Sequence, residues 1–405
     1  MSNCPYVENE KGPLKTAVIV GAGFSRTLGV PAYDGVMKYI AKDLSEEFGQ
    51  LTQLQKKIDK EITTHIGKFL EDVFYYYGKS CMPSLEQIFT FIDLSANTGH
   101  NLGQNYTPGK LRALRRFLIY KLFLIIDKRY KRENSHFIGD FLKKLNASHY
   151  ISLNWDIVLE QCIDDFLHKD KIYTYGVNEI QVEINKEKRK FEKRHNSAPS
   201  NGIDRIKIAK VHGSANWAYC DNCKKIFYLK DETITKTFPL SIYVEDIKKF
   251  YKPGANHENK DLNDLISGIR QEKKSKECPE CKCSLGSHIA TFSYNKSFRT
   301  HAFNASWGLA EKILSDSERW FFIGYSLPIA DFEFAHMLKC EQIRTKPPKK
   351  IIVINCDRDD TIMQRYYSTF GINNVDYHNE GLENFVKNEL EGIESRWAKL
   401  ELSIR

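Results

Sequence analysis

Two pairs of cysteines stand at a spacing that suits a metal ion. Cys220 and Cys223 form one C-x-x-C pair, and Cys278 and Cys281 form the second. Four thiolates in two such pairs match the tetrahedral ligand set of structural zinc, and they leave no open position for catalysis. Cys283 lies close enough along the chain to replace Cys281 as a ligand. We therefore predict a structural Zn²⁺ site, and the alternative is a ribbon without metal.

A glycine turn from Gly21 to Ser25 directly follows the apolar run 17–20. Such a turn lets backbone N–H groups approach a pyrophosphate, and the N-terminus of a following helix favours the negative charge. The usual dinucleotide fingerprint is G-x-G-x-x-G, but Arg26 occupies the third glycine position here and the next glycine is Gly29. The turn predicts phosphate binding, and the alternative is a bare turn without a ligand.

Three more polar side chains come directly after strand-like segments. Asn154 and Asp156 follow the segment 149–153, and His212 follows 206–211. Ligands of open α/β sheets bind at these C-terminal strand ends. An amide can orient a ribose and a water, a carboxylate can offset positive charge on a sugar, and a histidine can accept a proton. The alternative is local: the first two residues cap the helix that follows, and the histidine is a buried turn residue.

Strand-like and helical segments alternate along most of the chain. The strand-like segments are 16–21, 149–153, 206–211, 289–293, 319–324 and 350–355. Helical patterns separate several of them, at 156–168, 301–315, 331–343 and 359–369. The runs at 17–20, 320–323 and 351–354 are continuously apolar, as expected of strands that helices cover on both faces. The pattern predicts an α/β fold with a doubly wound parallel sheet.

Two parts of the chain interrupt the alternation. The block 36–145 is mostly helical and too long for one crossover, so it predicts a helical subdomain. The polar segment 217–288 carries the paired cysteines and predicts a small inserted module. The ranges 1–35, 146–216 and 289–405 then form the sheet domain, which ends in a C-terminal helix.

The composition excludes several classes of protein. With 41% hydrophobic and 12% aromatic residues, the 405-residue chain has ample material for a core and is not globally disordered. No stretch approaches the 18 apolar residues of a membrane-spanning helix, and the N-terminus lacks the apolar region of a signal peptide. We therefore expect a cytoplasmic protein. The charged run 186–195 favours a solvated loop or helix face over a nucleic-acid patch, and the basic helix 110–132 fits nucleic acid or an oligomer or partner surface; the net charge of +8 does not decide between them.

Six features, in order along the chain, resemble those of the sirtuin (SIR2) superfamily. The segment from Gly21 to Tyr33 resembles the family's GAGxS and G-[IV]-P-x-[FY] opening. SLNWD at 152–156 is similar to its T-Q-N-x-D motif, and VHGS at 211–214 to its H-G motif, after which the two cysteine pairs follow. The ribose motif G-T-S-L and the strand that ends in Asn correspond to GYSLP and IVIN, which begin at residues 324 and 352.

This resemblance implies a Rossmann-like NAD⁺ domain with a zinc-ribbon insertion. The residues that it assigns to NAD⁺ binding are Gly21, Ala22, Gly23, Phe24, Ser25, Tyr33, Gly324, Ser326 and Asn355. Ala22, Gly23, Phe24 and Ser25 would line the phosphates, the tyrosine would belong to the loop over the nicotinamide side, and the last three would hold the adenosine half. The residues that it assigns to catalysis, beside the nicotinamide ribose, are Asn154, Asp156 and His212.

The chain departs from the deacylase branch of that family at two places. The family's D-F-R reads Ala32-Tyr33-Asp34, and the F-G-E segment that pairs with an acyl-lysine peptide is replaced by TFSYN at 291–295. The helical block resembles instead that of the SIR2-like proteins of bacterial antiviral defence, which hydrolyse NAD⁺. We therefore predict an NAD⁺ glycohydrolase that releases nicotinamide and ADP-ribose. The alternatives are a protein deacylase and a non-catalytic NAD⁺ or ADP-ribose sensor or nucleic-acid-binding subunit.

An NAD⁺ hydrolase with unrestrained activity would kill its own cell. We therefore expect activity to be gated by homo-oligomerisation or by a partner protein. The resemblance to defence systems implies a HerA-type ATPase, an Argonaute-like protein or a sensor of phage proteins as that partner, and NAD⁺ depletion of the infected cell as the outcome.

Overall fold

The computed structural model describes most of the chain. The described residues are 16–31, 33–44, 51–78, 81–129, 136–145, 149–167, 171–185, 190–194, 204–230, 232–233, 242–252, 259–271, 277–290, 293, 301–357 and 359–388. Half of the charged run 186–195 and most of the TFSYN segment at 291–295 lie outside these ranges.

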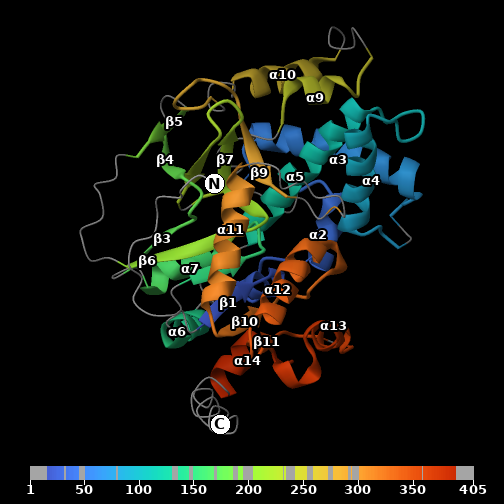
Figure 1. Ribbon diagram of the computed structural model, residues 1–405. Helices are drawn as coiled ribbons and strands as arrows, with labels where there is room; N and C mark the ends of the chain where they lie inside the picture. The colour runs from blue at the N-terminus through green and yellow to red at the C-terminus, as the bar shows by residue number, and fades with distance from the viewer. Residues whose placement is uncertain are drawn as a thin grey trace.

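The main sheet has seven strands, and every neighbouring pair in it is parallel. In spatial order the strands are β12 (Val375–His378), β11 (Lys350–Ile354), β10 (Arg319–Ile323), β1 (Thr16–Val20), β2 (His149–Ser152), β6 (Asp204–Lys210) and β3 (Lys171–Thr174). The chain starts in the middle at β1, fills one side of the sheet, and returns to β10 to fill the other (Figure 1). The predicted α/β class and parallel sheet are confirmed, and the order is consistent with a Rossmann-like fold.

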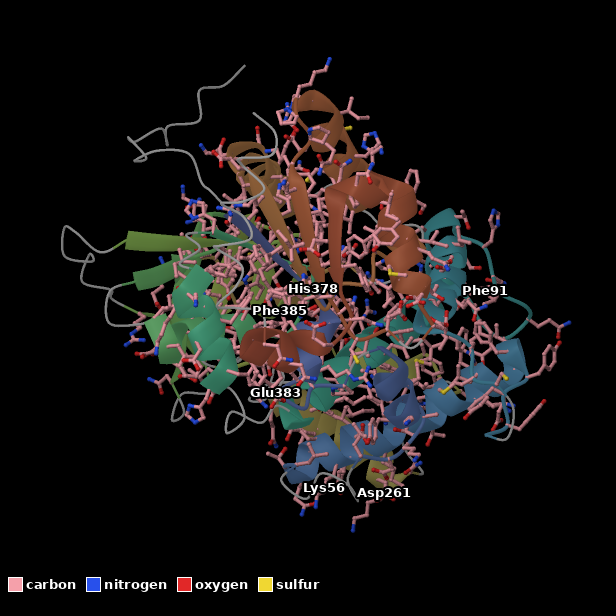
Figure 2. All side chains as sticks on the ribbon, turned by 90° about the horizontal axis from the view of Figure 1, so that it is seen from below. Lys56, Phe91, Asp261, His378, Glu383 and Phe385 are labelled. Atoms are coloured by element: carbon pink, nitrogen blue, oxygen red, sulfur yellow. The ribbon has the colours of Figure 1, made fainter. Side chains whose placement is uncertain are left out.

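Helices cover both faces of this sheet. One face packs against α6 (His136–Leu145), α7 (Val158–Leu167) and α14 (Gly381–Asn388), and the other packs against α11 (His301–Asp316), α12 (Phe332–Arg344) and α13 (Thr361–Phe370). Within β1, Val18 and Val20 face the first layer whereas Ala17 and Ile19 face the second, because successive side chains of a strand alternate. Burial on both faces explains the continuous apolar runs. At one edge, Phe385 of α14 packs edge-on against His378 of β12 (Figure 2).

A second, five-stranded sheet stands beside the first and occupies the upper part of Figure 1. Its spatial order is β5 (Lys190–Lys193), β4 (Glu179–Asn185), β8 (Lys225–Leu229), β7 (Gly213–Cys220) and β9 (Leu285–Ile289). The strand predicted at 289–293 was wrong in position and in sheet, because β9 ends where that segment begins and pairs antiparallel with β7. The sheet also takes β4 and β5 from before residue 217, where the inserted module was expected to begin.

The helical block consists of α2 (Tyr33–Ile40), α3 (Gln53–Phe74), α4 (Leu85–Thr98) and α5 (Pro108–Arg129). Capping boxes start α3 at Thr52 and α4 at Ser84, where each side chain accepts the backbone N–H three residues on. The apolar residues that recur at three- and four-residue spacing along α5 are buried: Leu111, Leu114, Leu118, Leu122 and Ile125. α6 lies in the same stretch of sequence, but it packs against α7 and α14 under the main sheet.

The helical block and the second sheet share one hydrophobic core. It joins Ile62 and Phe117 of the block to Phe227 of β8 and to Leu265 of α10 (Lys260–Gln271). α9 (Val244–Lys248) and α10 lie against α5 and α3. The block and the module are therefore packed together as well as against the main sheet.

Three basic residues in the middle of α5 have partners inside the protein. Lys121 is fully buried and its Nζ lies 3.1 Å from Asp59 Oδ1, while Arg115 pairs with Asp93 at 3.0 Å. Arg116 pairs with Asp246 of α9. These charges hold helices together, so this stretch of the helix predicted at 110–132 is not an open basic surface. None of the described helices combines the length and the apolarity needed to cross a membrane.

Candidate functional site

A cavity of about 390 Å³ lies at the C-terminal ends of β1, β2, β6 and β10. The strand order reverses between β1 and β10, and ligands of open α/β sheets bind at such a reversal. The predicted site residues that line it are Gly21, Ala22, Ser25, Asn154, Asp156, His212, Gly324 and Ser326. Leu85 of α4 and Leu122 and Ile126 of α5 form another wall. The helical block thus narrows an opening that the sheet alone would leave wide.

The glycine turn packs directly against the turn after β10. Gly23 N donates to Gly324 O at 2.8 Å, and Gly21 N donates to Ile323 O at 3.0 Å. Gly324 has φ +60°, and a Cβ there would lie 2.2 Å from Phe24 N. Only glycine permits this backbone-to-backbone contact, since any side chain would force the turns apart. The glycines are needed for loop packing, whether or not a phosphate binds.

Four of the residues assigned to NAD⁺ binding do not line the cavity with described side chains. Phe24 is fully buried in the core beneath the sheet, and Gly23 faces the neighbouring turn. Asn355 Nδ2 donates to Tyr325 O at 3.1 Å, so it holds the turn after β10 and does not face the cavity itself. Tyr33 begins α2, and its side chain lies outside the described residues.

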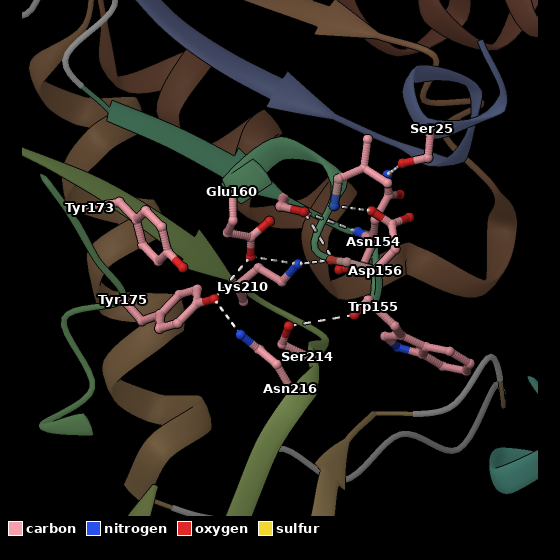
Figure 3. Close-up of polar contacts among 12 residues, drawn as sticks. Ser25, Asn154, Trp155, Asp156, Glu160, Tyr173, Tyr175, Lys210, Ser214 and Asn216 are labelled. Atoms are coloured by element: carbon pink, nitrogen blue, oxygen red, sulfur yellow. Dashed lines mark hydrogen bonds and ion pairs between the residues drawn. The ribbon is translucent and has the colours of Figure 1, made fainter. Parts of the chain in front are cut away.

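Asn154 is tied to the glycine turn by its side chain (Figure 3). Its Nδ2 donates to Gly21 O at 2.8 Å and to Ser25 Oγ at 3.1 Å. A carbonyl can only accept, so the amide nitrogen must face Gly21 and the amide oxygen must face away from it. That oxygen has no hydrogen bond to any described residue, and the residue lines the cavity. Asn154 therefore does not cap the following helix, which was the alternative.

Asp156 does serve partly as a cap, because its Oδ1 accepts Val158 N at 3.0 Å at the start of α7. The carboxyl also accepts the Ser25 hydroxyl, which joins it to Asn154. Burial raises the pKa of Asp156, while the nearby Lys210 ammonium and the Val158 N–H oppose that rise. Lys210 is therefore the charge that favours an ionised carboxylate at this position.

Lys210 belongs to a fully buried polar network beneath the cavity floor (Figure 3). Its Nζ lies 3.1 Å from Glu160 Oε1 and donates to Asp156 O at 2.5 Å. Tyr175 Oη donates to Glu160 Oε1 at 3.1 Å, and Asn216 Nδ2 donates to Tyr175 Oη at 3.0 Å. Two fully buried charged groups are stable only when they are paired with each other and hydrogen-bonded. The network fixes the backbone of the segment that carries Asn154 and Asp156.

His212 faces the cavity from the end of β6 and is 4% exposed. Its Nδ1 donates to Leu153 O at 3.1 Å, since the carbonyl can only accept, and its Nε2 lies 3.4 Å from Asp331 Oδ1. Asp331, in the 3₁₀ turn η4 (Ile329–Asp331), accepts the Tyr325 hydroxyl on Oδ2 at 3.0 Å. Gly213 follows with φ +79°, where a Cβ would lie 2.1 Å from His288 O. That contact excludes any other residue after the histidine.

Sequence reasoning missed Asp331 and Lys210. Asp331 stands three residues after the GYSLP motif, where it reads as the start of the helix predicted at 331–343. Lys210 carried a usable signal, because a lysine inside an apolar parallel strand needs a buried partner. That partner, Glu160, lies on α7, and only the fold brings the two together.

The four paired cysteines form one cluster at the end of β7. The Sγ atoms of Cys220, Cys223, Cys278 and Cys281 all lie within 4.8 Å of one another, and Cys283 is not in the group. The Cys220–Cys281 and Cys223–Cys278 sulfur distances are 3.4 and 3.9 Å, near the roughly 3.8 Å edge of a tetrahedron with Zn–S bonds of about 2.3 Å. The Cys283 backbone N–H and the Cys223 side chain lower the pKa of Cys281 to about 6, which favours its thiolate, whereas the Cys281 side chain raises the pKa of Cys223 and burial raises the pKa of Cys278. The donor set is compatible with zinc.

The chain matches no protein-family model and no curated protein sequence. Its function therefore has to be inferred from the chemistry of this cavity.

Proposed function

We propose that the protein is an NAD⁺ glycohydrolase that cleaves the nicotinamide–ribose bond to give nicotinamide and ADP-ribose. The observation that carries the proposal is the convergence of Asn154, Asp156 and His212 with the glycine turn around one cavity at the reversal of strand order. These residues are far apart in the sequence, and each has a group suited to a different part of this reaction. The resemblance of their motifs to the SIR2 superfamily supports the same substrate.

The reaction develops positive charge on the ribose as nicotinamide leaves as a neutral base, so no acid is needed for the leaving group. The free amide oxygen of Asn154 orients the ribose and the attacking water. The Asp156 carboxylate, favoured by Lys210, offsets the developing charge. His212 Nε2 accepts a proton from the attacking water while the water oxygen bonds to the ribose carbon. Asp331 stabilises the imidazolium that results.

We further propose that the cysteine cluster binds a structural Zn²⁺ ion as a zinc ribbon. All four ligands come from the protein, so the ion would join β7 to the segment before β9 and take no part in bond cleavage. In the same proposal the enzyme acts in the cytoplasm as a gated effector of antiviral defence, within a homo-oligomer or with a partner such as a HerA-type ATPase.

Product analysis tests the reaction. Purified protein is incubated with NAD⁺, with and without an acetylated peptide, and products are separated by chromatography. We expect the wild type to form nicotinamide and ADP-ribose without peptide. Asn154→Ala and His212→Ala should each lower the rate of nicotinamide release at least about 100-fold and leave the melting temperature unchanged. Full turnover by either variant contradicts the assignment. O-acetyl-ADP-ribose formed only with the peptide identifies a deacylase, and tight NAD⁺ binding without nicotinamide release identifies a sensor.

Gating is tested with the same assay. The isolated wild-type chain is expected to turn over NAD⁺ slowly at low protein concentration and faster when it oligomerises, measured by light scattering beside nicotinamide release. A full rate from dilute monomer excludes a required activator or assembly.

A further inference from the structure

The proposed substrate carries two phosphate charges, but the charged residues of the described cavity wall are mostly acidic. Glu86, Asp156 and Asp331 line it, and Arg365 is the one lysine or arginine among the described lining residues. The helix that follows the glycine turn, α1 (Ala22–Arg26), has only five residues, so few aligned peptide dipoles stand behind its N-terminus. A dianionic group in this cavity needs another source of positive charge.

Arg365 is placed to supply that charge. It lies on α13, is half-buried, and reaches the turn after β10, where its Nη1 donates to Ser326 O at 3.3 Å. The next residue, Tyr366, is fully buried and its hydroxyl donates to Tyr325 O at 2.9 Å, which fixes α13 against the same turn. Arg365 forms no ion pair with a described carboxylate, and a guanidinium has five N–H donors. Most of its hydrogen-bonding capacity therefore remains for a ligand.

The charged residues of the lining come from different elements. Asp156 and His212 follow β2 and β6, Asp331 lies in η4, and Arg365 reaches the turn after β10 from α13. A ligand that is cationic at one end and phosphorylated at the other matches this arrangement, because each end then meets the opposite charge. Oxidised nicotinamide dinucleotides have this polarity.

We propose that Arg365 binds a phosphate group of the dinucleotide and thereby sets its direction in the cavity. This inference depends on the proposed function for the identity of the ligand. The guanidinium reaches either the pyrophosphate or a 2′-phosphate, and both present the paired oxygens that arginine binds through two parallel hydrogen bonds. The direction places the nicotinamide–ribose bond beside Asn154 and His212.

Calorimetric binding of ADP-ribose to the full-length protein tests this inference without catalysis. We expect Arg365→Ala and Arg365→Gln to bind ADP-ribose about 10- to 100-fold more weakly, because they lose a charge-assisted contact. Both variants should bind adenosine, which has no phosphate, as the wild type does. Lys339→Ala is the matched control, since Lys339 is exposed on α12, donates to Thr369 O of α13, and does not line the cavity. It removes the same charge and should bind ADP-ribose normally.

The second arm uses ADP-ribose 2′-phosphate. A loss confined to this ligand assigns Arg365 to the 2′-phosphate, whereas a loss with both ligands assigns it to the pyrophosphate. Unchanged affinity for both overturns the inference, and so does an equal loss for adenosine, which would indicate a structural role. If the wild type binds ADP-ribose through Arg365 but releases no nicotinamide from NAD⁺ in any state of assembly, the inference stands and the proposed hydrolase activity fails.

Discussion

The two ring nitrogens of His212 have different tasks. Leu153 O accepts from Nδ1, so in the neutral ring the lone pair is on Nε2, which lies 3.4 Å from Asp331 Oδ1. A carboxylate at that distance holds the ring in place and, in the proposed reaction, stabilises the positive charge of the imidazolium. Tyr325 in turn fixes the carboxylate by donating to its other oxygen. Asp331 therefore acts through His212, as a positioning residue.

Replacing Asp331 with Asn keeps the shape of this contact and removes its charge. We expect kcat for NAD⁺ cleavage to fall about 100-fold, the usual size of a general-base contribution, with KM changed less than about threefold. Glu333→Gln is the control, because this substitution removes the same charge from an exposed side chain two residues further along the chain. Steady-state kinetics of both variants measure these changes in kcat and KM. A rise in KM with unchanged kcat would instead place Asp331 in substrate binding.

At the scale of elements, the sequence predicted the strands that both helix layers cover and missed those that they do not. β1, β10 and β11 are continuously apolar after their first residue because both of their faces are buried there. β3 and β12 lie at the edges of the main sheet and are only four residues long, with polar residues among the apolar ones. Short edge strands carry little periodic signal, since each presents only two residues to a face.

The residues of the candidate site also separate into those that the sequence predicted and those that it missed. Asn154, Asp156 and His212 each follow a recognisable strand, so their convergence could be predicted from topology alone. Asp331 and Arg365 come from a turn and a helix whose place over the cavity depends on tertiary packing. No local pattern in the sequence encodes that packing.

His288 joins two elements and should make the fold sensitive to acid. It lies on β9 between the rings of Tyr219 on β7 and Phe303 on α11, with centroids 4.5 and 4.3 Å away. Burial lowers the pKa of His288 to about 4, whereas the unfolded chain has the ordinary value of about 6.5. Above the unfolded pKa both states are neutral. As the pH falls from there towards 4, the unfolded state binds the proton first and stability decreases.

Between pH 7 and pH 5 this one residue should lower the free energy of unfolding by about 2 kcal/mol. Urea unfolding of the wild type and of His288→Gln at both pH values measures the effect, and the variant should lose that much of the pH dependence. Other acid-sensitive groups, the thiolates included, are common to both proteins and cancel in the comparison. Equal pH slopes in the two proteins would contradict the assignment.

At the scale of the whole molecule, the second sheet links the other two parts. Ala218 and Phe227 on one of its faces belong to the core shared with the helical block, while Trp217 and Ile226 on the other belong to the core beneath the main sheet. The helical block in turn forms one wall of the cavity. The shape of the cavity therefore depends on a sheet whose described strands supply no residue to its lining.

The cysteine cluster should for this reason stabilise more than its own strands. Cys220 and Cys278 are fully buried in the core shared with α3 and α5, while the buried residues of β10 and β11 belong to the two cores on either face of the main sheet. Zinc analysis should find one ion per chain in the wild type and in Cys283→Ser, the matched control outside the cluster, and none in Cys220→Ser. We expect loss of the ion to destabilise the protein by more than about 4 kcal/mol.

Hydrogen exchange should accelerate in β7, β9, α3 and α5 of Cys220→Ser while β10 and β11 stay protected, because only the first group shares the core that contains the cysteine cluster. Acceleration confined to the strands would show that the block is stable without the ion, and normal zinc content in Cys220→Ser would exclude the four-thiolate site.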